Sequence, residues 1–308
     1  MSRRVALLIA IGAIPWTWFL VRDRLGEFGD LISLGLPALA LPAVALLALG
    51  LIWVRWRVVL AWMVSWSMVF ALAVYGPRLP ARMDDPVDPI TIVTANVRFD
   101  NPTPDQAAAD VIAKDADVVI MPEATFTTVH YLAQEYPYGQ WTWRGRSRVY
   151  AVAVYSRYPL REEKFIDLGN GVERVVVEAP TPFVLYAAHL SRPVIAPSQS
   201  SHVSHAENYR QVRELDRMVD AETMPVVIAG DLNLSDRVRG YRVLDDDLTD
   251  VTRDGWAATT YVGGLYRFFL LRIDHVFASE GWCGDDADEF TITGSDHRGV
   301  RVDIGVCG

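Results

Sequence analysis

Cysteine and clustered histidine are scarce in this chain. Only two of its 308 residues are cysteine, Cys283 and Cys307, and its six histidines include no His-x-x-x-His pair. Zinc sites are built from clustered Cys and His, so a zinc centre is not expected. The two cysteines fit either one disulfide in an oxidising compartment or two unrelated thiols. The sequence also has no internal repeat, so a repeat architecture is not expected.

Basic residues are scarce in the C-terminal part of the chain. Residues 1–83 hold eight of the 29 Lys and Arg and three of the 38 Asp and Glu, which leaves residues 84–308 with a net charge of −14. Avid nucleic-acid binding rests on neutralising phosphates with Lys and Arg, so such a surface is a poor match for it. A nuclease that reaches the phosphate through a bound metal is not excluded.

Long apolar runs, in contrast, fill the front of the chain. Hydrophobic residues make up 51% of the sequence, and the excess lies in residues 5–21, 31–54 and 58–76. Each run is roughly 17 to 24 residues long, which suffices for a bilayer-crossing helix. The pattern predicts a membrane domain with three transmembrane helices in residues 1–77. A cleaved signal peptide is the alternative for the first run, although no small-x-small cleavage site precedes Arg22.

Three spans would place the two ends of this membrane domain on opposite faces. The flanking arginines are four on each side, so the positive-inside rule does not decide the orientation. Acidic residues in the first loop and the option of a disulfide favour a multi-pass cell-membrane protein whose C-terminal domain lies outside the cytoplasm.

Residues 78–89 form a Pro- and Asp-rich linker, and residues 90–308 then alternate between strand-like and helix-like segments. This alternation predicts an α/β domain with two layers of sheet flanked by helices. Strands are expected at residues 90–95, 118–121, 149–155, 172–178, 183–189, 226–229, 273–278 and 300–304, and helices at residues 104–114, 127–135 and 207–221.

Polar residues follow or flank several of these apolar runs. They supply carboxylates, imidazoles and amides, the inventory for holding a hard cation, gripping a phosphate and activating water. The motifs, in chain order, are Asn96-Val97-Arg98, Met121-Pro122-Glu123, His189-Leu190, Gly230-Asp231-Leu232-Asn233, Arg272-Ile273-Asp274-His275 and Ser295-Asp296-His297-Arg298.

In these six motifs and in their order, the chain resembles the endonuclease/exonuclease/phosphatase superfamily, whose fold is that of deoxyribonuclease I. The resemblance covers about residues 89 to 304. It implies a four-layer α/β/β/α sandwich, here preceded by the three transmembrane helices, with the site at one rim of the sheets. The chain departs from the family in one motif, because Pro122 stands where a Gln usually precedes the glutamate.

A hard-cation site is expected at the ends of the first strands. A carboxylate such as Glu123 can coordinate Mg²⁺ while leaving several waters in place, and the resemblance makes Glu123 the main metal ligand. Asn96 can orient the metal or its water, and Asp296 is a further metal candidate. Oxygen ligands favour Mg²⁺, with Mn²⁺ as an alternative. Arg98 is expected to approach the phosphate or to support Glu123.

The remaining motif residues are expected to carry the chemistry. His297 is the favoured general base because its ordinary pKa is near neutral, and Asp274 is expected to set its tautomer. The resemblance implies that Asp231 orients or deprotonates the water and that Asn233 donates to a phosphoryl oxygen. It also implies that His189 contacts the phosphate. Whether Asp231 or His297 takes the water proton is left open by the sequence.

These features predict a membrane-anchored, Mg²⁺-dependent phosphohydrolase. The anchor and the acidic domain favour a lipid-linked phosphate or pyrophosphate substrate, such as a prenyl pyrophosphate. The superfamily that the chain resembles includes enzymes that cleave prenyl pyrophosphates. A cell-surface nuclease acting on nucleic acid is the first alternative. A non-catalytic, membrane-anchored binding module is the second, and no obligate protein partner is evident.

Overall fold

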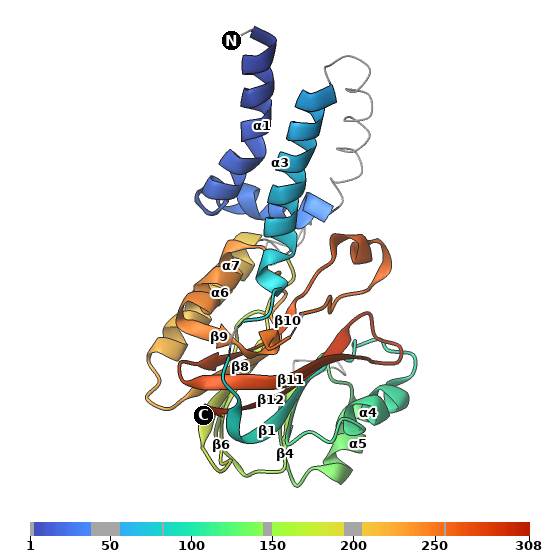
Figure 1. Cartoon of the computed structure of the whole chain (residues 1–308). Coiled ribbons are helices and arrows are strands. Elements are labelled where there is room, and N and C mark those ends of the chain that lie inside the picture. Colours follow the sequence, from blue (N-terminus) through green and yellow to red (C-terminus); the bar gives the residue numbers. More distant parts are fainter. Residues whose placement is uncertain (1–2, 38–55, 82, 144–149, 194–204, 256) are drawn as a thin grey trace.

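Two six-stranded mixed sheets form the body of the protein. The computed structural model describes residues 3–37, 56–81, 83–143, 150–193, 205–255 and 257–308 (Figure 1). The first sheet has the order β11-β12-β1-β2-β4-β3 and the second the order β5-β6-β7-β8-β10-β9. Their bounds are β1 (Pro86–Thr94), β2 (Val118–Pro122), β3 (Tyr138–Trp143), β4 (Tyr150–Ser156), β5 (Leu160–Ile166), β6 (Gly171–Val177), β7 (Phe183–His189), β8 (Val226–Asp231), β9 (Leu248–Asp250), β10 (Asp274–Ser279), β11 (Trp282–Thr291) and β12 (Arg298–Cys307).

The sheets pack face to face because their central strands are apolar on both sides. Side chains alternate between the two faces of a strand. In β2, Val118 and Ile120 point into the core between the sheets, whereas Val119 and Met121 point outward against helices. In β8, Val227 points inward. Continuous apolar runs are typical of such doubly covered strands.

Helices cover the outer face of each sheet (Figure 1). The helices α4 (Pro104–Ile112) and α5 (Phe126–Glu135) pack on the first sheet, and α6 (His205–Asp220) and α7 (Arg239–Asp247) pack on the second. The short 3₁₀ helices are η1 (Arg22–Leu25), η2 (Gly76–Arg78), η3 (Val251–Arg253) and η4 (Gly264–Phe269). The predicted α/β fold with two layers of sheet between helices is confirmed.

The segments that the sequence did not predict lie mostly at the edges of the sheets. The strands β3, β5, β9 and β11, and the helix α7, were not expected. The sequence of β11 is rich in acidic residues, and its pairing with β12 shifts register between Asp285 and Asp288. Charges and bulges of this kind protect an edge strand from pairing with other chains. Cys283 and Cys307 form a disulfide that joins β11 to β12, which resolves the two alternatives for these cysteines.

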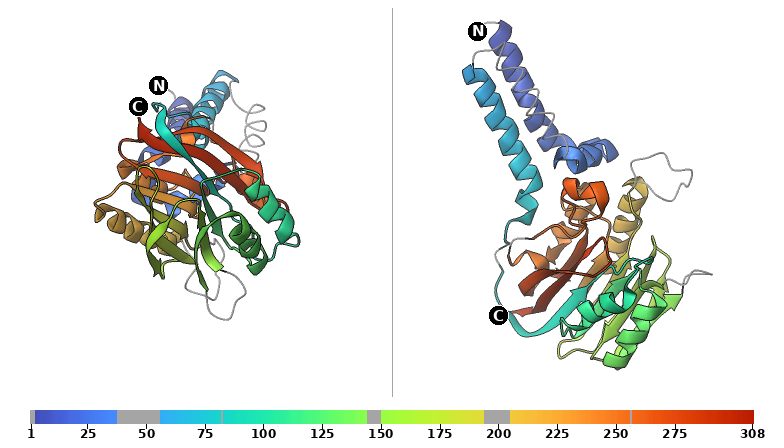
Figure 2. Two further views of the ribbon diagram at one scale, coloured as in Figure 1. Left: turned by 90° about the horizontal axis from the view of Figure 1, so that it is seen from below. Right: turned by 90° about the vertical axis from the view of Figure 1, so that its right-hand side faces the viewer.

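Two long helices, α1 (Arg3–Val21) and α3 (Trp56–Val74), project from the sandwich (Figures 1 and 2). They coincide with the first and third apolar runs, and most of the second run lies outside the described residues. Within the described parts of the chain, no helix has both the length and the apolar character that crossing a membrane requires. The three predicted transmembrane helices are therefore not supported.

The N-terminal segment makes specific contacts with the sandwich. Residues 27–37 are helical, and the buried Asp30 accepts hydrogen bonds from the backbone N–H and the Nε of Arg239 at 2.9 and 3.0 Å. Arg78, which was expected to begin a linker, is buried and donates from Nε to Asp236 at 3.1 Å. The strand β1 begins at Pro86.

A buried ion pair ties β9 and α7 to the segment that directly precedes β10. Arg272 contacts Asp250, and Tyr241 Oη donates to the same carboxylate at 2.7 Å. Burial alone would raise the pKa of Asp250, but the nearby Arg272 guanidinium holds it well below its usual range. The carboxylate is therefore ionised in the folded protein at neutral pH, and the stability it contributes is lost as the pH falls toward the acid range.

The Asp250→Asn substitution tests this cluster. It leaves Arg272 buried without a counter-charge, so we expect a loss of about 3–5 kcal/mol in the free energy of unfolding. Urea unfolding at pH 7 measures the loss. The matched control is Asp286→Asn, because Asp286 is 73% exposed and pairs with Arg301 at the surface; we expect less than about 1 kcal/mol there. Equal effects of the two substitutions would contradict the assignment.

Candidate active site

The predicted site residues meet at one edge of the two sheets because of how the strands pair. β7 and β8 are parallel, and their last residues, His189 and Asp231, are register partners. β10 is antiparallel to β8, so its first residue, Asp274, also pairs with Asp231. In the other sheet β1 and β2 are parallel and end before Asn96 and Glu123. Strand pairing within each sheet, together with the face-to-face packing of the two sheets, therefore brings the ends of four strands and the start of a fifth to one rim.

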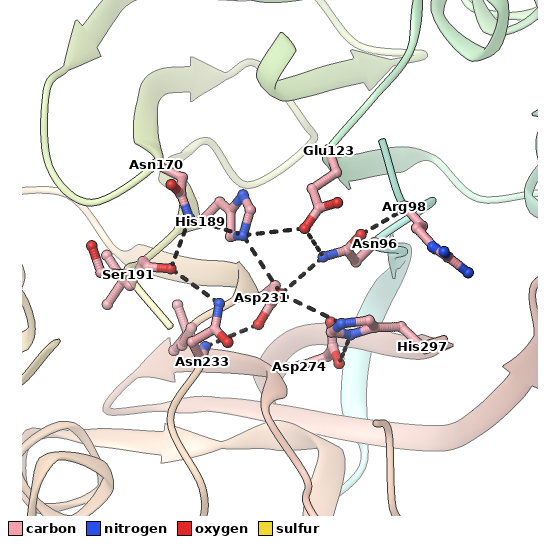
Figure 3. Close-up of polar contacts among 12 residues, drawn as sticks. Asn96, Arg98, Glu123, Asn170, His189, Ser191, Asp231, Asn233, Asp274 and His297 are labelled. Carbon is pink, nitrogen blue, oxygen red and sulfur yellow. Dashed lines mark hydrogen bonds and ion pairs between the residues drawn. The ribbon is translucent and has the colours of Figure 1, made fainter. Parts of the chain in front are cut away.

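Asp231 lies at the centre of this rim (Figure 3). Asn96 Nδ2 donates to its Oδ2 at 2.9 Å, and the backbone N–H of Asn233 donates to its Oδ1 at 2.9 Å. The residue is 1% exposed. Burial, together with the charge of Asp274, raises the pKa of Asp231 above its ordinary value, although His297 and His189 act in the opposite direction.

Gly230 makes this placement of Asp231 possible. Its φ is +144°, and a Cβ there would lie 1.9 Å from the carbonyl oxygen of Ala188 on the neighbouring strand. Glycine is the residue that accepts such a backbone without a clash. Glycine at position 230 is thus a steric requirement of the sheet.

Glu123 and Asn96 form the opposite wall. Asn96 Nδ2 is 3.2 Å from Glu123 Oε1, and the backbone N–H of Phe99 donates to Glu123 Oε2 at 2.9 Å. Glu123 has a φ of +55°, which is rare for a residue with a long side chain and costs on the order of 1–2 kcal/mol. Strain of this kind is typical of functional sites.

His297 is held by Asp274. Its Nδ1 donates to Asp274 Oδ2 at 2.9 Å, and its Nε2 lies 3.8 Å from Asp231 Oδ2. Burial alone would lower the pKa of His297, but the charges of Asp274 and Asp231 raise it to about 10. The imidazole therefore carries a proton at neutral pH in the metal-free protein.

His189 and Asn233 complete the rim. His189 Nε2 lies 3.7 Å from both Glu123 Oε1 and Asp231 Oδ2. Asn233 donates one amide hydrogen to the backbone oxygen of Leu190 at 3.0 Å. A primary amide has two such hydrogens, so the second is available to a substrate oxygen.

A divalent cation fits this group of residues. Glu123, His189 and Asp231 each offer a ligand atom within 4.8 Å of the others, and so do Asp231, Asp274 and His297. Three carboxylates meet here, and no Lys or Arg among the described residues forms an ion pair with any of them. Carboxylate and amide oxygens suit Mg²⁺ or Mn²⁺.

Two expected residues are placed differently. Arg98 is directed away from Asp231 in Figure 3, and its guanidinium pairs with the exposed Asp100 at 2.5 Å. Asp296 belongs to neither group of possible metal ligands among the described residues. It lies instead near Tyr261. Burial raises the pKa of Tyr261, and the negative charge of Asp296 raises it further.

Four residues of the site were missed by the sequence analysis. Asn170 Nδ2 lies 3.2 Å from His189 Nε2. The Tyr261 ring meets the His297 ring edge-on at 5.0 Å. Thr260 Oγ1 accepts from the backbone N–H of Asp274, and Ser295 Oγ accepts from that of His297. Ser295 stood inside a recognised motif, whereas the other three lie in turns and loops that carry no pattern of their own.

The Asp274→Asn substitution tests the electrostatics of the site. Loss of the carboxylate destabilises the imidazolium, so we expect the pKa of His297 to fall from about 10 toward its ordinary value. NMR titration of the imidazole protons in EDTA measures it. Asp100→Asn, which removes a carboxylate paired with Arg98 at the surface, should leave it unchanged. An unshifted pKa in Asp274→Asn would show that Asp274 does not control His297.

The two-sheet domain is similar to known proteins over most of its length. The model of the endonuclease/exonuclease/phosphatase family matches residues 93–297. An endonuclease/exonuclease/phosphatase from Beutenbergia cavernae DSM 12333 is 21% identical with a TM-score of 0.57, covering 71% of this chain and 72% of that chain. Sphingomyelinase C from Streptomyces griseocarneus is 18% identical with a TM-score of 0.50, covering 70% and 99%.

A third solved structure, D. rerio TDP2 complexed with a single-strand DNA product, is 16% identical with a TM-score of 0.54, covering 71% of this chain and 100% of that chain. No curated protein sequence matches the chain. Identities this low show the shared fold alone. The family match, however, extends from β1 to His297 and includes every strand end that forms the rim, so the chain belongs to the endonuclease/exonuclease/phosphatase family.

Proposed function

We propose that this protein is a Mg²⁺-dependent hydrolase that cleaves a phosphoester or pyrophosphate bond of a lipid-linked substrate. The observation that carries the proposal is the meeting of Glu123, Asp231, His189 and the His297–Asp274 pair at one rim. Members of the family are typically metal-dependent phosphoester hydrolases. The donor set of this chain supports the same chemistry.

Each side chain has a role that its geometry supports. Glu123 and Asn96 would hold the cation, which supplies Lewis-acid stabilisation of the phosphoryl oxygens. Asp231 and His297 lie 3.8 Å apart and both have raised pKa values. Because the His297 imidazole already carries a proton at neutral pH, we assign the proton of the attacking water to the Asp231 carboxylate, with the His297 imidazolium stabilising the charge and Asp274 holding the imidazole in place. His189 and the free amide hydrogen of Asn233 would stabilise negative charge on the phosphoryl group.

A lipid-linked substrate is supported by the N-terminal helices. Apolar side chains on α1 and α3 are exposed to solvent in the isolated chain, among them Leu20 at 76%, Ile9 at 59% and Met68 at 51%. Exposed apolar patches of this kind mark protein or membrane contacts. We further propose that residues 1–77 hold the protein at the cell membrane. The Cys283–Cys307 disulfide supports an extracytoplasmic catalytic domain.

A parallel assay tests this function. The full-length protein in detergent micelles is incubated with a prenyl pyrophosphate, a sphingomyelin-type lipid and plasmid DNA, each with Mg²⁺ and again with EDTA. We expect release of phosphate from the prenyl pyrophosphate, its loss in EDTA and its return with Mg²⁺ or Mn²⁺. Full activity in excess chelator would refute the metal role. Cleavage of DNA far faster than any lipid turnover would make the protein a nuclease instead.

The His297→Ala substitution tests the Asp231–His297 pair. General acid–base catalysis contributes about 10² to 10⁴ in rate, and we expect kcat to fall by that factor while the domain stays folded by circular dichroism. His130→Ala is the matched control, because His130 is exposed on α5 and should retain full activity. Near-normal turnover by a folded His297→Ala protein would show that the role is misassigned.

A further inference from the structure

A mostly apolar pocket lies beside the catalytic rim. Its walls come from the helical residues 27–37, the segments that follow β7 and β8, the start of α6, and the segment from Tyr261 to Ile273 that contains η4. Leu34, Val238, Phe269 and Leu271 line it. Leu34 and Val238 are buried, whereas Phe269 and Leu271 are half-buried. Ligand sites are typically concave and apolar with a few polar groups at one end.

The pocket is continuous with the site, because three of its lining residues also belong to the rim or touch it. Asn233 lies two residues after Asp231 and donates its backbone N–H to that carboxylate. Tyr261 meets the His297 ring. Ile273 directly precedes Asp274. A phosphate at the rim would thus have its substituent beside the mouth of an apolar cavity.

The N-terminal segment supplies one wall of this pocket. Leu34 lines it, and Leu270, the residue after η4, packs against Leu36, Ala73 and Val74. Figure 2 shows the N-terminal helical segment lying directly against the η4 loop. Leu265 and Phe268 of the loop are themselves 77% and 57% exposed. The pocket therefore lies where the apolar helices meet the catalytic domain.

Charge at the pocket complements an anionic head group. Arg192 lines it, is exposed, and forms no ion pair with any described residue. Arginine binds phosphate oxygens through its planar fork of donors. An apolar cavity, a guanidinium with no ion-pair partner in the described part of the chain, and the catalytic rim thus occur side by side. These are the three features that an amphiphilic phosphate requires.

We propose that this pocket receives the apolar alkyl or isoprenoid chain of the substrate while the phosphate lies at His189 and Asn233, with Arg192 contacting the head group. This inference rests on the proposed function and assigns the residues that select the lipid. Because one wall is Leu34, residues 27–37 are part of the substrate site and do more than tether the domain.

The expected gain in binding affinity follows from the burial of the ligand's alkyl chain in the pocket. Each buried methylene contributes about 0.8 kcal/mol, which corresponds to roughly a fourfold change in the dissociation constant. Lengthening a ligand by two methylenes should therefore tighten binding by about an order of magnitude until the pocket is filled. A purely electrostatic phosphate site would show no such dependence.

Binding of butyl-, hexyl- and octylphosphonate to the full-length protein in lipid nanodiscs tests the proposal. Isothermal titration calorimetry measures each dissociation constant, with empty nanodiscs as the blank. Phosphonates are not hydrolysed, so the measurement does not depend on catalysis. We expect affinity to rise by roughly fourfold per methylene. Because the three ligands share one head group, Arg192→Gln should weaken the binding of all three to the same extent.

Two neighbouring phenylalanines provide a matched pair of variants. Phe269→Ala removes a wall of the pocket and should weaken octylphosphonate by about tenfold while leaving butylphosphonate almost unchanged. Phe268 does not line the pocket and is 57% exposed, so Phe268→Ala should match the unmodified protein. Leu271→Trp, which fills the cavity, should abolish the chain-length dependence, and thermal unfolding shows whether each variant is folded.

The outcomes separate the two proposals. Phosphonate affinity that does not change with chain length, or that is equally affected by Phe268→Ala and Phe269→Ala, would overturn the pocket assignment even if lipid hydrolysis is observed. Chain-length dependence that persists in a folded Leu271→Trp protein would also overturn it. Chain-dependent binding without hydrolysis of any phosphate substrate would support the pocket and refute the proposed function.

Discussion

The burial of the Asp231 carboxylate is the constraint on which the rest of the site depends. A carboxylate that is 1% exposed loses its hydration, and that loss must be offset by hydrogen bonds and nearby charges. They come from separate segments of the chain: Asn96, the backbone of Asn233, His189 and His297. Both sheets must therefore end at one level. Within the second sheet, the in-register pairing of β7, β8 and β10, with glycine at position 230, aligns the strand ends.

The N-terminal segment is joined to the catalytic domain by side-chain contacts as well as by the polypeptide chain. Asp30 binds Arg239 at the start of α7, and Arg78 binds Asp236 in the loop after β8. Both pairs are partly or fully buried. Removing one partner would therefore leave the charge of the other in a poorly hydrated position. Leu34 lies next to these contacts and lines the pocket beside the rim. Contacts that fix the N-terminal segment thereby also fix one wall of the proposed lipid site.

Prediction from the sequence succeeded for the central strands and failed at the edges. Residues 118–121 and 183–189 are short, continuously apolar runs, and they form β2 and β7. The acid-rich β11 has no such signal, because an edge strand is stabilised by backbone pairing with β12 on one side only. The helix α7 was missed for a related reason: its charged sequence buries only Gly240, Tyr241 and Leu244. Neither segment could be found without knowing its tertiary neighbours.

By itself, the sequence determined which side chains end the central strands, because apolar periodicity and the following polar residue are local properties. Together with the order of the six motifs, this grouped six residues that the structure brings together: Asn96, Glu123, His189, Asp231, Asp274 and His297. Only the tertiary structure decided that Arg98 pairs with Asp100 and that Asp296 interacts with Tyr261. It alone decided that Asp274 and Asp231 raise the pKa of His297 and that Leu34 and Phe269 line one pocket. These properties depend on distances between residues remote in the chain, and electrostatic and packing energies are set by such distances.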